Sequence, residues 1–322
     1  MTLDLLDRRL LYELDLNARQ PLSVLTKKIH VSRNVLIYRL NRLRESGIIK
    51  NSFAEINSIA LGYKTFRIFI KIGNCSPDER KRLDAFLMSQ RNLTWFSRVL
   101  GEWDIDVLFT SKDIEEFETF RNSLFLSFNS MIKDSHISLL SRIYCYHRDY
   151  LLGKERKEVI RKVLGPSKCV PDSKDEEILY LLTEDGAMSA LEISRRTSLS
   201  VNTVIKRIHT LENENVILAY RVFIDTNKLG YQYFKLHIFL RDYSQKDIIA
   251  LRHFLESKSY VVYTDHYIGG ADFEIELHLK TEMEYTDFVD SLIERFGRII
   301  EDHRLIKFYE ELLFRYLPLR VE

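Results

Sequence analysis

The sequence predicts an α+β fold made of two tandem copies of one two-domain unit, because residues recur 168 positions apart along the 322-residue chain without any gap. A spacing this long differs from the periods of about 20 to 50 residues found in solenoid proteins and indicates a duplicated domain pair. We expect the linked copies to fold as the two halves of a pseudo-dimer. The matched pairs include Asp7 and Asp175, Arg39 and Arg207, Gly62 and Gly230, Gly101 and Gly269, and Phe128 and Phe296.

A change of hydrophobic period inside each copy supports the α+β prediction. Apolar residues follow the i, i+3, i+4 spacing of helices before the segment Leu61-Gly62-Tyr63, and they alternate with a period near two after it. The same change follows Leu229-Gly230-Tyr231. Each copy therefore begins with a helical domain and continues with a domain that contains a sheet.

Three helices are expected in residues 1–50. Leucines at helical spacing predict the first helix near residues 3–14, and a second, short helix follows Pro21. Ser32 is a good N-cap for a third helix at about residues 33–45, which Gly47 ends. Residues 48–56 alternate loosely and are expected to form a wing hairpin. Residues 175–225 repeat this scheme, with Asn215 in the place of Gly47, and asparagine tolerates the positive φ of such a helix stop.

The remainder of each copy predicts the order βαββαβ, which is the ferredoxin-like pattern. Strands are indicated by β-branched and aromatic residues, and the two helices by amphipathic spacing. The second copy repeats the pattern from residue 231 to about residue 316. In the first copy the expected strands are 66–72, 93–100, 103–110 and 137–146, and the expected helices are 78–89 and 115–131.

Composition limits the function classes. The chain is 45% apolar and 30% charged, with a net charge of +1, which is ordinary for a soluble globular protein. No apolar run reaches the length of a membrane span, and the N-terminus does not resemble a signal peptide. The three cysteines form no CxxC pair and no zinc spacing, so we expect no metal, no cofactor and a reducing cytoplasm.

The helix that follows Ser32 has the properties of a DNA recognition helix. Such a helix lies in the major groove with its first residues at the base edges, so it needs one apolar face and one polar, basic face. Asparagine can pair with adenine and arginine with guanine, while serine and tyrosine can hold phosphates. The outward positions predicted to contact DNA in the first copy are Ser32, Arg33, Asn34, Tyr38, Asn41, Arg42 and Arg44.

The second copy offers a less basic face. Thr210 and Glu212 replace Arg42 and Arg44 there. The residues predicted to contact DNA are Ser200, Asn202, Lys206 and His209. Two alternatives remain open: each helical domain could be a protein-interaction module, and Arg39 and Arg207 could be ion-pair partners of Asp7 and Asp175 instead of phosphate contacts.

Taken together, these motifs resemble those of the Lrp/AsnC (feast/famine) family of transcriptional regulators, duplicated in tandem. The resemblance rests on Asn17-Ala18-Arg19, on residues 24–32 and 39–49, and on their counterparts at 192–200 and 207–217. Residues 225–231 resemble the junction that ends in Leu-Gly-Tyr, and residues 101–104 and 269–272 resemble the Gly-x-x-Asp motif of the sensor domain. The resemblance covers nearly the whole chain except the linker.

The resemblance implies a winged helix-turn-helix DNA reader joined to a ferredoxin-like sensor domain in each copy. It implies double-stranded DNA as a partner, an amino acid as the effector, and an internal pseudo-dimer that can assemble into higher even-numbered homo-oligomers. The expected domains are reader 1 at residues 1–60, sensor 1 at 61–150, a charged linker at 151–172, reader 2 at 173–228 and sensor 2 at 229–322.

The effector is expected near Gly101 and Asp104 or near Gly269 and Asp272, where a glycine lets a backbone approach a ligand and a carboxylate could hold an amine. The alternative, that these residues only shape a tight turn, is favoured for the aspartates. Because Trp103 would partly fill the first cleft, the effector should prefer the second.

An enzyme is the competing class. Some paired proteins of this architecture decarboxylate sirohaem with sensor-domain His, Tyr and Arg residues. The corresponding stretch here, Thr264-Asp265-His266-Tyr267, lacks that enzyme pattern, and His266 is better read as a strand residue. No other catalytic motif is legible in the sequence, so we expect a regulator without catalytic residues.

Overall fold

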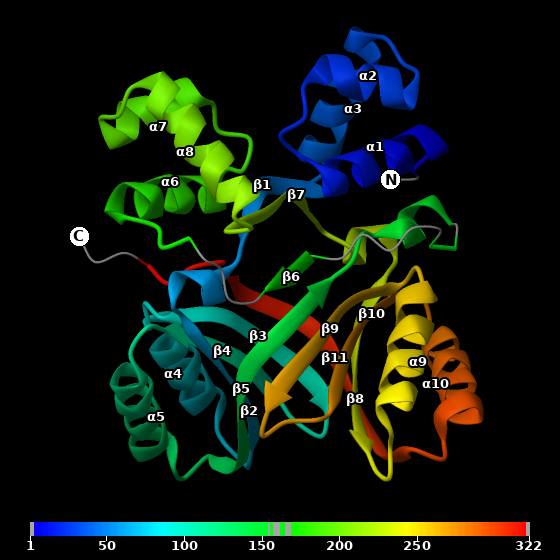
Figure 1. The fold of residues 1–322 in the computed structure, drawn as a ribbon. Coiled ribbons are helices and arrows are strands. Elements are labelled where there is room, and N and C mark those ends of the chain that lie inside the picture. Colours follow the sequence, from blue (N-terminus) through cyan, green and yellow to red (C-terminus); the bar gives the residue numbers. More distant parts are fainter. Residues whose placement is uncertain (1–2, 154, 157–161, 165–168, 320–322) are drawn as a thin grey trace. The chain divides into compact units, whose positions relative to one another are not determined.

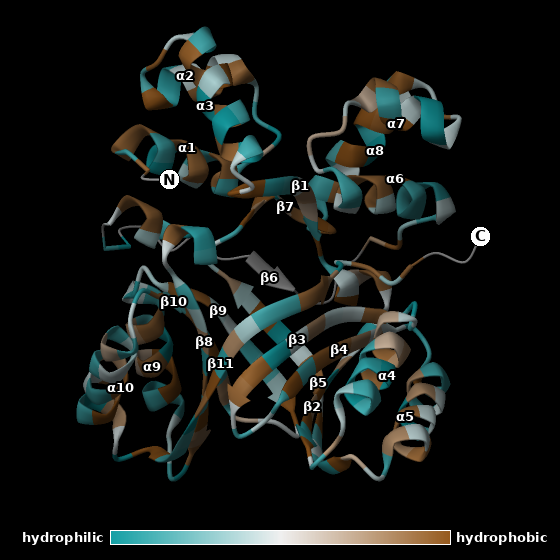
Figure 2. Ribbon diagram, turned by 180° about the vertical axis from the view of Figure 1, so that it is seen from behind, coloured by the Kyte–Doolittle hydropathy of each residue, from teal (hydrophilic) through white to brown (hydrophobic). Residues whose placement is uncertain are grey.

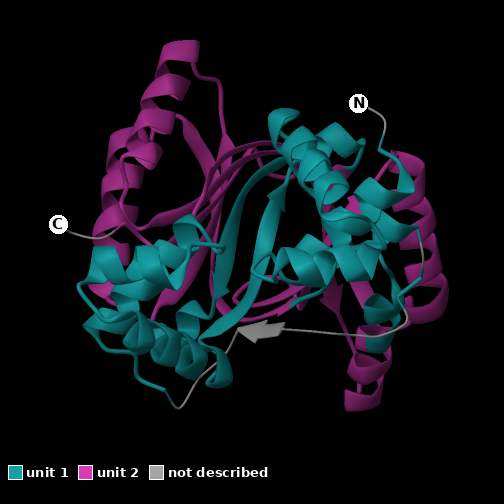
Figure 3. Cartoon of the chain, turned by 90° about the horizontal axis from the view of Figure 1, so that it is seen from above, with its two compact units in different colours: residues 1–61, 145–231, 253–262 teal, residues 62–144, 232–252, 263–322 magenta. Residues whose placement is uncertain are grey.

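The computed structural model describes residues 3–153, 155–156, 162–164 and 169–319. The chain forms two compact units (Figure 3). Unit 1 contains residues 1–61, 145–231 and 253–262, and unit 2 contains residues 62–144, 232–252 and 263–322. Equivalent parts of the two copies therefore group together, with the two helical domains in unit 1 and the two sheet domains in unit 2.

Unit 1 holds two trihelical bundles, coloured blue and green in Figure 1. In both bundles the first helix begins with a capping box, in which Asp4 and Asp172 cap the amides of Asp7 and Asp175. Asn215 adopts a φ of 56°, close to the 67° of Gly47, as expected from its tolerance of the left-handed region. The helices are α1 (Leu5–Leu16), α2 (Leu22–Ile29), α3 (Arg33–Glu45), α6 (Ser173–Glu184), α7 (Ala190–Thr197) and α8 (Val201–Asn213).

The prediction of a wing hairpin at residues 48–56 is wrong. These residues form one strand, β1 (Ile49–Ile56), which pairs antiparallel with β7 (Ile217–Ile224) of the second copy. The segment has no two-residue turn of the kind that closes a hairpin, so its backbone groups find their partners across the repeat. The two copies are thus joined by a two-stranded sheet inside unit 1.

A buried ion cluster strengthens this junction on one side. Asp15 of α1 is fully buried and accepts hydrogen bonds from the main-chain amide of Arg148 at 3.0 Å and from Arg221 of β7 at 2.8 Å. Burial alone would raise the pKa of Asp15, but Arg148 and Arg221 together lower it to about 2. The corresponding positions on the other side hold Thr183 and Phe53, so this part of the junction is not symmetric.

In unit 2 the strand order is β2-β4-β3-β11-β8-β10-β9-β5, and an additional pairing of β2 with β5 joins the two ends. The strands therefore form a closed ring. The long strands β5 and β11 pair across the copies; β11 pairs with β8 of its own copy and with β3 of the first copy. The strands are β2 (Lys64–Ile72), β3 (Leu93–Gly101), β4 (Ile105–Ser111), β5 (Ile132–Cys145), β8 (Gln232–Leu240), β9 (Val261–Ile268), β10 (Phe273–Leu279) and β11 (Ile300–Phe314).

Each βαββαβ domain carries two helices on the outside of the ring, as expected for the ferredoxin-like pattern (Figure 1). The helices are α4 (Pro77–Met88), α5 (Ile114–Phe128), α9 (Gln245–Ser257) and α10 (Glu282–Phe296). Outward-facing strand residues such as Ile68, Ile70 and Val107 form one hydrophobic core with Leu83 and Leu124 of the helices. Apolar and hydrophilic residues are interspersed along the strands (Figure 2). The remaining elements are β6 (Lys162–Leu164) and three short helical turns, Ser58–Leu61, Asp149–Leu152 and Asn227–Leu229.

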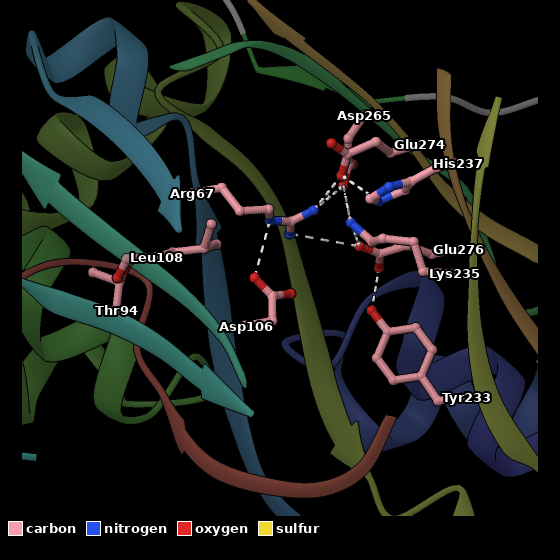
Figure 4. A network of polar contacts seen from close by, with 10 residues as sticks. All are labelled: Arg67, Thr94, Asp106, Leu108, Tyr233, Lys235, His237, Asp265, Glu274 and Glu276. Atoms are coloured by element: carbon pink, nitrogen blue, oxygen red, sulfur yellow. Dashed lines mark hydrogen bonds and ion pairs between the residues drawn. The ribbon is translucent and has the colours of Figure 1, made fainter. Parts of the chain in front are cut away.

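The inner face of the ring carries a buried network of charges (Figure 4). Arg67 and Lys235 occupy equivalent places, and so do Asp106 and Glu274. Arg67 of the first copy pairs with Glu274 of the second, and Lys235 lies 3.0 Å from Glu274. A closed ring with polar inward residues lets the two copies neutralise each other's charges.

The second copy adds two further acids, Asp265 and Glu276, where the first copy has Ser97 and Leu108. Four buried carboxyl groups thus face two permanent cations in the network of Figure 4. Burial raises the pKa of Asp265 to about 8, although Lys235 at 3.0 Å opposes this. At neutral pH Asp265 therefore holds a proton.

The first prediction concerns the junction of unit 1. Replacing Asp15 with Ala removes the carboxylate that pairs with both buried Arg148 and buried Arg221, and breaking a buried ion pair costs about 3 to 5 kcal/mol. Thermal or urea denaturation should show this loss, whereas the matched control Thr183→Ala should cost far less. Equal losses in the two variants would contradict the asymmetric junction.

The second prediction concerns Asp265. Because folding raises its pKa from 3.8 to about 8, unfolding releases a proton between these pH values, so this group makes stability fall as the pH rises through that window. Urea denaturation of wild type and Asp265→Asn at pH 5 and pH 8.5 should show that the variant loses this part of the slope. Asp134→Asn, an exposed change on β5, should behave like wild type. An unchanged slope in Asp265→Asn would refute the assignment.

Candidate functional site

The exposed face of α3 forms the candidate site of the first copy. Ser32 is the N-cap, and its side chain accepts a hydrogen bond from the amide of Val35 at 3.4 Å. Arg33, Asn34, Asn41 and Arg44 are exposed, and none of their side chains forms a hydrogen bond or ion pair with another described residue. The tyrosine predicted on this face, Tyr38, is 65% exposed. These donors are free to meet a ligand that lies along α3.

Arg42 differs from its neighbours. Its guanidinium pairs with Asp7, which is fully buried at the start of α1, and it lies 5.9 Å from the Tyr38 ring. Arg39 lies 2.7 Å from the other Asp7 oxygen and also contacts Asp4. The two arginines therefore fasten α3 to α1, which agrees with the ion-pair alternative for Arg39.

The second copy has the same ion pairs between its first and third helices. Arg207 lies 2.8 Å from Asp175 and 2.9 Å from Asp172. Thr210 stands in the place of Arg42, and its hydroxyl donates to the carbonyl of Lys206 within the same helix. In the second copy one arginine, Arg207, links α8 to α6. The ion pair of Arg42 with Asp7 is therefore found only in the first copy.

Some polar side chains on the outward face of α8 are already held by contacts within the chain. Ser200 is the N-cap and accepts from the amide of Thr203 at 3.2 Å, and Asn202 and Lys206 are exposed. His209 pairs with Glu212 at 3.1 Å.

Glu212 occupies the place of Arg44 and accepts a hydrogen bond from Tyr220 at 2.7 Å. An acceptor anchored there disfavours phosphate near the end of α8.

Sequence reasoning missed one exposed cation of the first copy. Lys27 of α2 is exposed, and it forms no ion pair with any part of the chain that the structure describes. Its position in the helix that braces α3 was the signal that could have revealed it. The neighbouring Lys28, in contrast, is held by Glu13 at 2.6 Å.

The Gly-x-x-Asp turns of unit 2 use their aspartates structurally. Asp104 accepts a hydrogen bond from the amide of Ile72 at 2.8 Å, and Asp272 accepts one from Leu240 at 2.7 Å. Gly101 has a φ of 122°, and a side chain there would meet the carbonyl of Leu305 at 2.3 Å. These contacts favour the turn interpretation for both aspartates.

The residues between each glycine and aspartate differ, as the sequence indicates. Trp103 is buried and packs on Phe69, with 6.0 Å between their rings. The second copy carries a buried alanine, Ala271, in the place of Trp103. The two turns are therefore not equivalent as ligand sites.

Two features are absent from the described ranges. No helix there is long and apolar enough to cross a membrane. No group of three His, Cys, Asp or Glu side chains in that part of the chain is placed to hold a metal ion.

Comparison with known proteins identifies the class of protein to which the chain belongs. A model of winged helix-turn-helix DNA-binding domains matches residues 3–50 and again residues 171–217, one match in each copy. An HTH-type transcriptional regulator of Pyrococcus abyssi is 32% identical over 116 residues, which are 35% of this chain and 77% of that protein. The chain belongs to the HTH-type transcriptional regulators.

Solved structures resemble this HTH-type transcriptional regulator over different lengths. The siroheme decarboxylase NirDL covers 99% of this chain and 94% of its own, with a TM-score of 0.63 and 12% identity. This likeness shows that the two chains share a fold. An AsnC family transcriptional regulator from Agrobacterium tumefaciens is 21% identical, with a TM-score of 0.38, and the match covers 42% of this chain and 89% of that one.

The third prediction separates the two arginines at the end of α3. Arg44→Ala removes an unpaired exposed cation, so it should weaken DNA binding and lower the salt slope of log K by about one phosphate contact without changing the melting temperature. Arg42→Ala removes a partner of buried Asp7, so it should also lower the melting temperature. Anisotropy titrations at several salt concentrations, together with thermal denaturation, measure both effects. A lower melting temperature in Arg44→Ala, or none in Arg42→Ala, would contradict this division.

Proposed function

We propose that this chain is a sequence-specific regulator of transcription that binds double-stranded DNA with two unequal readers. The observation that carries the proposal is the unpaired polar face of α3, with Asn34, Asn41 and Arg44 exposed, against the weaker face of α8. Asparagine and arginine are the side chains best suited to read adenine and guanine in the major groove. The first reader should supply most base contacts, and the second should mainly position the complex.

The pairing of β1 with β7 supports a fixed arrangement of the two readers within unit 1. Dimers of helix-turn-helix proteins bind half-sites about 34 to 36 Å apart, and two identical readers favour a palindrome. In this chain the two readers differ in sequence, so the preferred operator should consist of two different half-sites.

Effector control is part of the proposal. An effector acts only if it binds differently to the DNA-bound and free states. We assign a small effector such as an amino acid to the Gly269–Asp272 turn, because Trp103 occupies the corresponding place in the first copy. Calorimetry with an amino-acid panel on wild type and Ala271→Trp tests this assignment, and binding that survives the substitution would refute it.

A non-catalytic role is proposed despite the fold shared with the siroheme decarboxylase. His266 packs edge-on against Tyr144 and Phe273, at ring distances of 5.7 and 4.8 Å, as a partly buried strand residue. A haem-like visible absorbance in purified protein would favour the enzyme alternative. A winged-helix module that only binds proteins would show no sequence-dependent DNA binding.

The fourth prediction uses a matched pair of variants. Asn34 and Asn202 occupy the same position of the two readers, 168 residues apart. On an operator selected from random DNA, Asn34→Ala should lose about 1 to 3 kcal/mol of discrimination at one base pair, as expected for a bidentate contact. Asn202→Ala should lose less. Equal losses would contradict unequal reading, and no loss in either variant would contradict base reading by these helices.

A further inference from the structure

Arg98 of β3 lies at the centre of an ion triplet in the first copy. It pairs with Asp84 of α4, and its Nε lies 3.1 Å from a carboxylate oxygen of Glu310 of β11. The Arg98 side chain is only 12% exposed, so the two carboxylates neutralise a cation that is largely removed from water. This place on unit 2 therefore contains one central cation and two flanking anions.

The second copy reverses the charges at the same three positions. Arg252 of α9 stands in the place of Asp84, His266 of β9 in the place of Arg98, and Arg142 of β5 in the place of Glu310. Two arginines now flank a histidine, and none of these three positions carries a carboxylate. The repeat thus provides an internal reference in which the same place holds one cation paired with two carboxylates.

The three side chains meet around Tyr144. The guanidinium carbon of Arg252 lies 5.0 Å from the centre of the Tyr144 ring, and that of Arg142 lies 6.0 Å from it. Arg142 donates a hydrogen bond to the Tyr144 hydroxyl at 3.1 Å. Ser141 donates to the carbonyl of His266 at 2.9 Å, which fixes β5 beside β9 at this point. Two permanent cations are consequently held against one aromatic ring.

Several polar atoms of this cluster are unsatisfied. Arg252 Nε and His266 Nε2 are buried and have no hydrogen-bond partner. Neither Arg142 nor Arg252 forms an ion pair with a residue in the described ranges. The pKa of His266 is lowered by its burial and then by Arg252 and Arg142, so these surroundings disfavour a third positive charge at this place. Contacts with a tyrosine ring offset the repulsion of two cations only in part.

We infer that Arg142, Arg252 and His266 form a binding site for an oxyanion, a carboxylate or phosphate group of a small molecule. Two guanidinium groups can donate several charge-assisted hydrogen bonds to such a group, and arginine is the side chain that best matches its geometry. The anion supplies the negative charge that Asp84 and Glu310 supply in the first copy. The inference is independent of DNA reading, because its residues lie in unit 2 and its test needs no DNA.

Calorimetry and thermal denaturation of the full chain, in a buffer low in chloride and without DNA, test the site. Inorganic phosphate and succinate are the probes, and they distinguish a phosphate site from a carboxylate site. We expect at least one probe to bind and to raise the melting temperature of wild type. Arg252→Gln should weaken that binding about tenfold or more, as expected for the loss of hydrogen bonds to a charged group.

Two further variants make the result decisive. The triple change Arg142→Glu, Arg252→Asp and His266→Arg rebuilds the first-copy triplet in the second copy, so the chain should fold and bind neither probe. Arg98→Gln, at the matching place of the first copy, should leave the affinity of wild type within about twofold. Failure of both probes to bind wild type, or undiminished binding by a folded triple variant, would overturn the inference.

Discussion

The ion pair between Arg67 of the first copy and Glu274 of the second shows the constraint on which unit 2 depends. Both side chains are almost fully buried inside the ring, and a charge left there without its partner is far more costly than a charge in water. Arg67 therefore buries its charge against acids of both copies, Asp106 of its own copy and Glu274 of the other. Closure of the ring by β5 and β11 brings these partners together within one chain.

Covalent linkage of the copies also changes what each copy must conserve. In a homodimer every substitution appears twice, whereas here one side of a contact can change alone. Asp15 and Arg221 form a buried pair on one side of the β1–β7 junction, and Thr183 and Phe53 occupy the other. The same freedom explains why Glu212 of the second copy replaces Arg44 of the first. It also explains why Arg252 and Arg142 stand where the first copy has the carboxylates of Asp84 and Glu310.

Periodicity, capping residues and the repeat were enough to predict the order of helices and strands, including the left-handed stop at Asn215. The prediction of a wing hairpin was wrong because residues 48–56 carry no information about a partner strand 168 residues away. The role of Arg42 was not separable from that of Arg44 by spacing, since only the fold brings Asp7 to it. Clusters such as that around Tyr144 require the strand pairing, because their residues lie on three elements far apart in the sequence.

Selection of the operator from random DNA, followed by hydroxyl-radical footprinting of the complex, tests unequal reading by a single-chain pseudo-dimer most directly. The account predicts an operator with two different half-sites, a strong sequence preference in the half contacted by α3 and a weaker one in the half contacted by α8. A perfect palindrome protected equally on both sides would contradict it.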